Sequence, residues 1–264
     1  MWKIELSNIF FTWRFGLIMG SVIFENDEMS IVQQELGQYE NLNHLIVCKK
    51  TCQAAIIDPF DGPYWLDYCS TNNIQLVAIW LTHSHWDHTR GVEAIVNHIP
   101  TIPVILHVKE VERGWDGTLD FALSHEEWTS SEIQVGEMLV HAHLTPGHTP
   151  GHLTFVHKHF VASGDCMFLG RCGRVDLFGG DEIAQRNSLK YLRDVLVNMP
   201  KQSMILPGHR YVLSSGQNPT FMLTGDFLSS NEALLAVDHD EQWNALTFLR
   251  FDDQLARRAR AQQS

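Results

Sequence analysis

The sequence predicts an α/β protein of the α+β kind, in which two β-sheets pack face to face and helices cover their outer faces, an αββα sandwich. Two observations predict this class. Short apolar runs typical of strands come in groups with helical segments interspersed, whereas strict strand–helix alternation would predict one parallel sheet. The composition, with 44% hydrophobic and 19% charged residues among 264, is that of an ordinary globular protein.

The first half of the chain carries five expected strands and three expected helices. The strands are short apolar runs bounded by turn residues, over residues 31–36, 44–48, 54–58, 76–81 and 101–106. The helices are expected over residues 63–73, 91–98 and 108–115. Pro63 suits the first turn of its helix, because the N–H that proline lacks would have no helical partner there. Residues 116–131 lack periodicity, which predicts a surface loop.

The second half begins with an expected hairpin, in which Gly136-Glu137 joins runs over residues 131–135 and 138–144. Further strands are expected over residues 153–156, 160–163 and 203–206, and a long amphipathic helix over residues 181–198. We therefore assign residues 29–213 to the sandwich. Residues 214–264 form a small, mostly helical C-terminal region, whose arginines are expected on a solvated helix face.

Residues 1–28 form an N-terminal extension to which several roles fit. Its apolar stretch, residues 15–24, is too short to span a bilayer, which takes ~20 apolar residues. An extra strand or arm of the fold, an upstream extension and a targeting segment all fit this stretch, although no small-x-small cleavage site follows it.

The charge and the cysteines limit the partners and the compartment. A formal net charge of −12 argues against a nucleic-acid partner, because phosphate binding requires a basic face. The five cysteines, an odd number at irregular spacing, do not suggest a disulfide framework. We therefore expect a cytoplasmic protein that acts on a small molecule and has no stable membrane span.

A burst of metal-ligating residues follows the strand expected over residues 76–81. The segment Thr82-His83-Ser84-His85-Trp86-Asp87-His88 contains three imidazoles and one carboxylate. Imidazole nitrogen and carboxylate oxygen together suit a transition metal, most simply zinc or iron. A solvated loop that happens to be rich in histidine is the alternative, but further ligands occur downstream.

Three more strands end in glycine-containing turns that carry a possible ligand. These turns are Thr145-Pro146-Gly147-His148, Ser163-Gly164-Asp165 and Leu206-Pro207-Gly208-His209. A turn just past a strand can aim its ligand into a shared cleft, and the neighbouring glycine lets the backbone come close. The candidate ligands are therefore seven: His83, His85, Asp87, His88, His148, Asp165 and His209.

Seven ligands are too many for one tetrahedral ion and suit two divalent ions, with zinc first and iron or manganese as alternatives. The expected grouping is His83, His85 and His148 for one ion and Asp87, His88 and His209 for the other. Asp165 can bridge the ions, because a carboxylate has two oxygens. A water between the metals would be deprotonated near neutral pH and act as the nucleophile, and Asp87 is placed to orient it or to move its proton.

Together these motifs resemble the metallo-β-lactamase-fold superfamily, whose hallmark HxHxDH corresponds to residues 83–88. The resemblance covers roughly residues 29–211 and keeps the downstream ligands in the superfamily's order. Residues 145–152 (TPGHTPGH), residues 164–168 (GDCMF) and Cys172-Gly173-Arg174 look like the glyoxalase II and persulfide dioxygenase branch. The resemblance implies a thioesterase that hydrolyses a hydroxyacylglutathione, such as lactoylglutathione.

The resemblance to glyoxalase II also implies two substrate-binding residues. Tyr211 closes a segment similar to the PGHxY motif, whose tyrosine contacts glutathione, and residues 244–250 loosely match the family's C-terminal NPFLR. Arg174 stands where the family has a basic contact, which suits the carboxylates of glutathione. Asp176 departs from the family, which has an aromatic residue there, and residues 174–181 (RVDLFGGD) are more similar to the GRTDFPGGD of related bacterial hydrolases and the GRTDF of persulfide dioxygenases.

Other functions stay open at this point. A glutathione persulfide dioxygenase would use a single iron held by His83, His148 and Asp165. A lactonase or β-lactamase-type hydrolase fits less well, because Arg174 and Tyr211 have no obvious role in it. A non-catalytic scaffold fits least, because all seven ligands are present.

Overall fold

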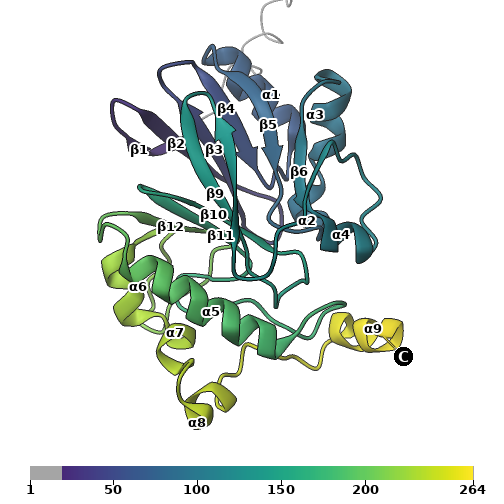
Figure 1. The fold of residues 1–264 in the computed structure, drawn as a ribbon, viewed down its shortest axis with the longest axis vertical. Helices are drawn as coiled ribbons and strands as arrows, with labels where there is room; N and C mark the ends of the chain where they lie inside the picture. Colours follow the sequence, from purple (N-terminus) through teal and green to yellow (C-terminus); the bar gives the residue numbers. More distant parts are fainter. Residues whose placement is uncertain (1–19, 264) are drawn as a thin grey trace, which may run out of the picture.

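The computed structural model describes residues 20–263. Two β-sheets pack face to face, and helices lie on both outer faces (Figure 1). The predicted αββα sandwich is therefore confirmed. The first half of the apolar stretch for which a targeting role was considered, residues 15–19, lies outside the described residues.

The first sheet has the strand order β1-β2-β3-β4-β5-β6-β7. Its strands are β1 (Ser21–Glu25), β2 (Met29–Leu36), β3 (Asn41–Cys48), β4 (Gln53–Ile57), β5 (Gln75–Trp80), β6 (Val104–His107) and β7 (Phe121–Leu123). Neighbours from β1 to β4 pair antiparallel, and those from β4 to β7 pair parallel. The prediction of a loop over residues 116–131 was wrong at β7, because three residues are too few to show a period.

The second sheet has the order β13-β12-β11-β10-β9-β8. Its strands are β8 (Ser130–Val135), β9 (Met138–Leu144), β10 (Leu153–His157), β11 (Phe160–Gly164), β12 (Met204–Pro207) and β13 (Met222–Leu223). The predicted hairpin of β8 and β9 is present, and Gly136 adopts a φ of 57° in its turn. Glycine takes this left-handed conformation without the strain that a Cβ would cause.

The described residues form nine helices. They are α1 (Gly62–Thr71), α2 (Trp86–Thr89), α3 (Val92–His98), α4 (Val108–Glu112), α5 (Glu182–Val197), α6 (Thr224–Ser230), α7 (Glu232–Ala236), α8 (Asp240–Asn244) and α9 (Gln254–Gln263). Six of the nine helices in the described residues pack on the outer faces of the sheets, α1 and α3 on the first and α5–α8 on the second (Figure 1). The side chain of Asp61 caps α1, and that of Asp181 caps α5 by accepting from the amide of Ala184 at 2.9 Å. Across residues 20–263, none of these helices combines the length and apolar character that crossing a bilayer requires.

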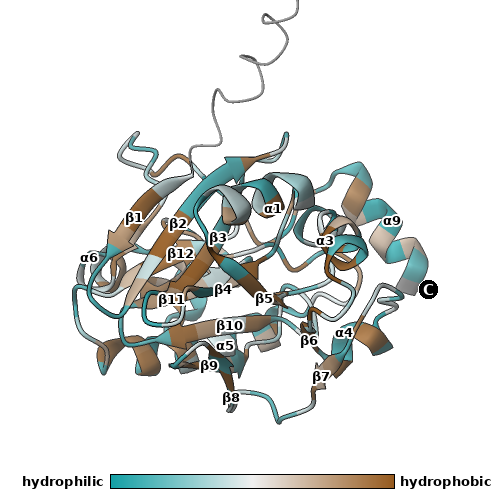
Figure 2. Cartoon of the chain, turned by 90° about the horizontal axis from the view of Figure 1, so that it is seen from above, coloured by the Kyte–Doolittle hydropathy of each residue, from teal (hydrophilic) through white to brown (hydrophobic). Residues whose placement is uncertain are grey.

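Three apolar layers hold the sandwich together. The central layer lies between the sheets and includes Trp80 against Phe155, with ring centroids 5.4 Å apart. A second layer, around Trp65, joins the first sheet to α1 and α3. The third, around Phe227 and Trp243, joins the second sheet to α5–α8. In Figure 2 the strands β1, β11 and β12 are largely hydrophobic, and α9 lies at the periphery of the molecule.

The C-terminal region shares a core with the second sheet, because α6, α7 and α8 contribute to the third apolar layer. On the other side of the chain, β1 pairs with β2, so residues 21–25 extend the first sheet. The boundaries at residues 28 and 213 stay predictions.

The last helix, α9, depends on the residue that precedes it. Asp253 accepts a hydrogen bond from the amide of Ala256 at 2.9 Å, as an N-cap residue does. Its carboxylate also accepts two hydrogen bonds from the Arg174 guanidinium, at 2.7 and 3.1 Å. A ten-residue helix is marginal in isolation, so these contacts and the burial of Ala256 and Ala259 keep α9 in place.

We expect D253N to loosen α9 and D253A to loosen it further. Asparagine keeps the cap and loses the ion pair, whereas alanine loses both. A cap contributes about 1 kcal/mol and a partly exposed ion pair at most about 1 kcal/mol, so amide exchange in α9 should rise about fivefold in D253N and more in D253A. Hydrogen–deuterium exchange measures this, and equal exchange in the three proteins would contradict it.

Candidate metal centre

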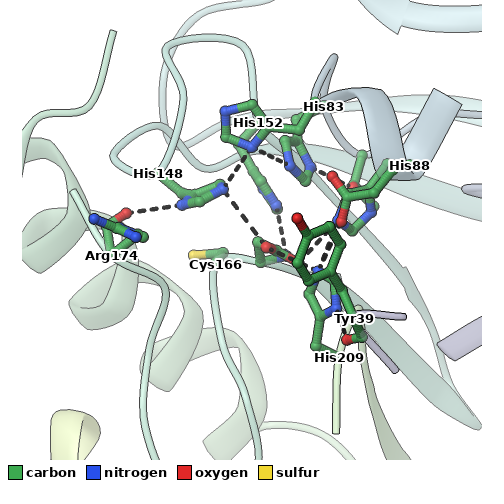
Figure 3. A network of polar contacts seen from close by, with 12 residues as sticks. Tyr39, His83, His88, His148, His152, Cys166, Arg174 and His209 are labelled. Atoms are coloured by element: carbon green, nitrogen blue, oxygen red, sulfur yellow. Dashed lines mark hydrogen bonds and ion pairs between the residues drawn. The ribbon is translucent and has the colours of Figure 1, made fainter. Parts of the chain in front are cut away.

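The structure brings the seven predicted ligands together where strands of both sheets end. Figure 3 labels four of them, His83, His88, His148 and His209. His83 follows β5, and the next three ligands lie at or in α2. His148 lies between β9 and β10, Asp165 follows β11, and His209 follows β12. The sheet edges therefore place ligands from distant parts of the chain in one cluster.

The ligands form two groups that match the expected grouping. In the first, Nδ1 of His85 lies 2.9 Å from Nε2 of His83 and 3.0 Å from Nε2 of His148. In the second, Nε2 of His209 lies 3.1 Å from Nε2 of His88 and 3.3 Å from Oδ2 of Asp87. Within each group the ligand atoms all lie within 4.8 Å of one another.

Asp165 faces both groups. Its Oδ2 lies 3.6 Å from Nε2 of His148 and 3.4 Å from Nε2 of His209. Its Oδ1 lies 3.4 Å from Nε2 of His88, is buried, and accepts no hydrogen bond from the residues that the structure describes. A buried carboxylate oxygen without a donor fits a metal ligand, because its lone pairs are otherwise unused.

Glycine next to the ligands allows this close approach. Gly147, before His148, has a φ of 143°, which a residue with a Cβ rarely adopts. A Cβ on Gly208, before His209, would lie 2.4 Å from Oδ1 of Asp165. The glycine of each Pro-Gly-His turn is therefore required by the geometry of the cluster.

Hydrogen bonds to the outer ring nitrogens orient four of the histidines. In each, Nδ1 faces an oxygen at 2.8–2.9 Å, which leaves the Nε2 lone pair pointing inward. The partners are Oγ1 of Thr82 for His83, Oδ2 of Asp58 for His88, the carbonyl of Arg174 for His148 and the carbonyl of Tyr39 for His209. His85 is reversed: its Nδ1 points inward, and its Nε2 lies 2.9 Å from Nη2 of Arg113.

Burial and charge set the protonation of the cluster. Burial lowers the pKa of His83 and of His148, which favours the neutral, metal-binding form. Burial opposes the charge on His88 as well, but the Asp165, Asp87 and Asp58 carboxylates outweigh it and raise the pKa of His88 to about 9. The carboxylates thus favour positive charge at the centre, the charge that a divalent ion would supply. The donor set and its polarity fit two metal ions.

Asp58 supports the centre and was not singled out by the sequence analysis. Its Oδ1 accepts from the amide of Thr82 at 2.7 Å, and its Oδ2 accepts from the Thr82 hydroxyl at 2.6 Å and faces Nδ1 of His88 at 2.9 Å. Both oxygens are therefore used by protein donors, so Asp58 orients ligands and is not needed as one. Its signal was available, because Asp58 ends a strand as the other site residues do.

Glu110 is the second residue that the sequence analysis missed. It is fully buried in the short helix α4. Its carboxylate accepts from the amide of Ser84 at 3.0 Å, from the Ser84 hydroxyl, and from the amide of Gly151 at 2.8 Å. Glu110 thereby joins the two loops that carry His85 and His148. No local pattern in the sequence points to this role.

His152 also lies behind the candidate ligands. Its Nε2 accepts from the amide of Asp165 at 3.1 Å, and burial lowers its pKa to about 3. The neutral ring therefore holds the backbone of Asp165 in position (Figure 3).

A cavity of about 850 Å³ opens above the cluster. Among the residues that line it are Trp86, Phe168, Tyr211, Arg171 and Arg174. Tyr211, predicted to bind substrate, is 39% exposed and is therefore accessible from the cavity. Arg174 also lines it, but its guanidinium is bound by the carboxylates of Asp176 and Asp253.

Comparisons with known proteins agree with this geometry. The sequence model of the family described as "Metallo-beta-lactamase superfamily" matches residues 53–209. The chain is 30% identical over 170 residues to a hydroxyacylglutathione hydrolase from Buchnera aphidicola subsp. Schizaphis graminum (strain Sg). That similarity covers 64% of this chain and 62% of the relative, so the chain spans less than two thirds of the relative's length.

Two solved structures are similar in fold. A metallo-beta-lactamase from Staphylococcus aureus subsp. aureus COL is 19% identical, with 90% of this chain and 73% of that chain covered and a TM-score of 0.70. The protein TTHA1623, in a di-iron-bound form, is 27% identical, with a TM-score of 0.58. The match covers 75% of this chain and 98% of that chain. The resemblance that the motifs suggested is thereby confirmed.

Proposed function

Because the chain belongs to the metallo-β-lactamase superfamily of metal-dependent hydrolases, we propose that it is a thioesterase that cleaves a hydroxyacylglutathione of the lactoylglutathione type. One observation carries the proposal: two ligand groups share Asp165 at the floor of a cavity with basic and aromatic walls. The similarity to a hydroxyacylglutathione hydrolase supports the choice of substrate. The five cysteines, all unbonded, support a cytoplasmic location, where glutathione keeps thiols reduced.

The proposed ligand sets are those seen in the geometry. His83, His85 and His148 would hold one ion, Asp87, His88 and His209 the other, and Asp165 both. Bound zinc or iron ions supply Lewis acidity, which polarises a thioester carbonyl and makes water acidic near neutral pH.

The side chains around the cluster have defined tasks in this proposal. Asp87 Oδ2 accepts from the Asn41 amide at 3.0 Å, which fixes the carboxylate beside His209 for orienting a water and holding its proton. Burial opposes ionisation of Asp87, but His88 and His209 lower its pKa, so the carboxylate is charged and able to accept a proton. The rings of Phe168 and Tyr211, whose centroids lie 4.8 Å apart, form a wall against which the substrate can lie.

Metal analysis and kinetics test the proposal together. We expect two metal ions per chain and release of glutathione from S-lactoylglutathione by the purified protein. H85A should lose at least about 100-fold in kcat/KM, because it removes a ligand of one ion. H98A replaces an exposed histidine at the end of α3 and should behave as wild type. Two metals without thioester hydrolysis would contradict the substrate assignment.

A glutathione persulfide dioxygenase is the second candidate. It is favoured by the ion pair of Arg174 and Asp176, whose Nε and Oδ1 atoms lie 2.6 Å apart. Both residues belong to the segment similar to the GRTDF pattern. One iron per chain, with oxygen consumption on glutathione persulfide and no thioester hydrolysis, would establish this activity in place of the first.

A further inference from the structure

Arg171 lines the cavity with a positive charge that no acceptor in the described part of the chain neutralises. It lies between β11 and α5, and its buried Nε has no hydrogen-bond partner among the residues that the structure describes. Among residues 20–263 its guanidinium forms no salt bridge, and the Glu232 carboxylate acts on it only from a longer distance. Buried polar groups usually have partners, so an unpaired cation in a cavity wall indicates a ligand that supplies one.

Aromatic rings hold the Arg171 guanidinium in place. Its Cζ lies 4.8 Å from the ring centroids of both Tyr211 and Phe248, and 5.8 Å from that of Phe251. Burial lowers the pKa of Arg171, although a guanidinium stays protonated in proteins. These ring contacts supply no oxygen acceptor for its N–H donors. Those donors form a fork that matches a carboxylate.

The other arginines nearest the cavity floor already have acceptors. Arg174 binds Asp176 and Asp253. Nε of Arg210 lies 3.0 Å from Oε2 of Glu35. Arg113 donates hydrogen bonds to the Ser84 hydroxyl and the Phe178 carbonyl. Arg258 lines the cavity from α9, but it is exposed to solvent, where water screens its charge. Arg171 is therefore better suited than these to bind an anion.

The position of Arg171 relates it to the metal centre. The ring centroid of Phe168 lies 6.0 Å from that of His209 and 4.8 Å from that of Tyr211. The ring of Tyr211 in turn contacts Arg171. A ligand along this aromatic wall can reach both the metal ligands and the guanidinium. We propose that Arg171 binds a carboxylate in the non-reacting part of the substrate. Only the assignment of that group to one of the two glutathione carboxylates rests on the proposed function.

Kinetics with charged and neutral thioesters test the proposal. For the metal-loaded protein, we compare S-lactoylglutathione with the lactoyl thioester of N-acetylcysteamine, which has no carboxylate. R171M should lower the ratio of the two kcat/KM values by about 10- to 100-fold, mainly through KM for the charged substrate. R171K keeps the charge without the planar fork, so its ratio of the two kcat/KM values should lie between those of R171M and wild type.

Arg186 provides a matched control. It also contacts an aromatic ring, with Cζ 5.4 Å from the Trp243 centroid, but it lies on α5 away from the cavity. R186M should keep the wild-type ratio. Thermal unfolding of each variant checks that the fold is intact. An unchanged ratio in a folded R171M or R171K would overturn the proposal.

Equilibrium binding separates this proposal from the proposed function. S-methylglutathione should bind the wild-type protein at least about 10-fold more tightly than its diethyl ester, whose carboxylates are neutral, and R171M should abolish that difference. This result would support the role of Arg171 even if the protein hydrolyses no thioester. Equal affinities of the wild-type protein for acid and ester, or no binding of either, would overturn it.

Discussion

Replacing Asp165 with alanine should lower thioester hydrolysis by at least about 1,000-fold and reduce the metal content to one ion or fewer per chain. The reason is that its Oδ2 faces His148 of the first ligand group and His209 of the second, and its Oδ1 faces His88 of the second. Metal ions contribute several kcal/mol of charge stabilisation to a transition state, and about 4 kcal/mol corresponds to a 1,000-fold change in rate.

Two further variants make this test specific. D165N keeps the size of the side chain but loses the charge and one oxygen, so its metal content should also fall. D67A removes an exposed carboxylate from the surface of α1 and should have the metal content and initial rate of the wild-type protein. Metal content by plasma emission spectrometry and initial rates on S-lactoylglutathione give the two readouts. Two ions per chain in D165A would show that Asp165 does not bridge them.

Replacing Glu110 with alanine should lower the free energy of unfolding by about 3–5 kcal/mol. The buried carboxylate accepts hydrogen bonds from the Ser84 and Gly151 amides, and without it these donors stay buried and unpaired. E110Q offers only one acceptor oxygen for donors on both sides, so we expect an intermediate loss. Urea unfolding of the metal-free protein measures the effect apart from any loss of metal.

Glu112 gives the control on the same helix. It is exposed, so E112A should change the unfolding free energy by less than about 0.5 kcal/mol. If the unfolding free energy of E110A also stays within about 1 kcal/mol of the wild-type value, Glu110 does not link the loops that carry His85 and His148.

Much of the fold could be predicted from the sequence, because strand and helix periods are local. The hairpin of β8 and β9 is encoded by two apolar runs around Gly136, and α5 by its apolar face and by Asp181 at its start. β7 and β13 could not be predicted, since strands of three and two residues show no period and are fixed by pairing with a distant strand.

The sequence by itself determined the sandwich class and named the candidate ligands that the structure brings together, because each candidate follows a strand in a short motif of fixed spacing. Only the tertiary structure decided which charged side chains around the centre are free. Arg174 is bound by Asp253, 79 residues away, and Asp58 faces His88, 30 residues away, whereas Arg171 has aromatic neighbours and no acceptor among residues 20–263. The spacing of motifs depends on the local chain, but the neutralisation of a charge depends on residues that folding alone brings within hydrogen-bonding distance.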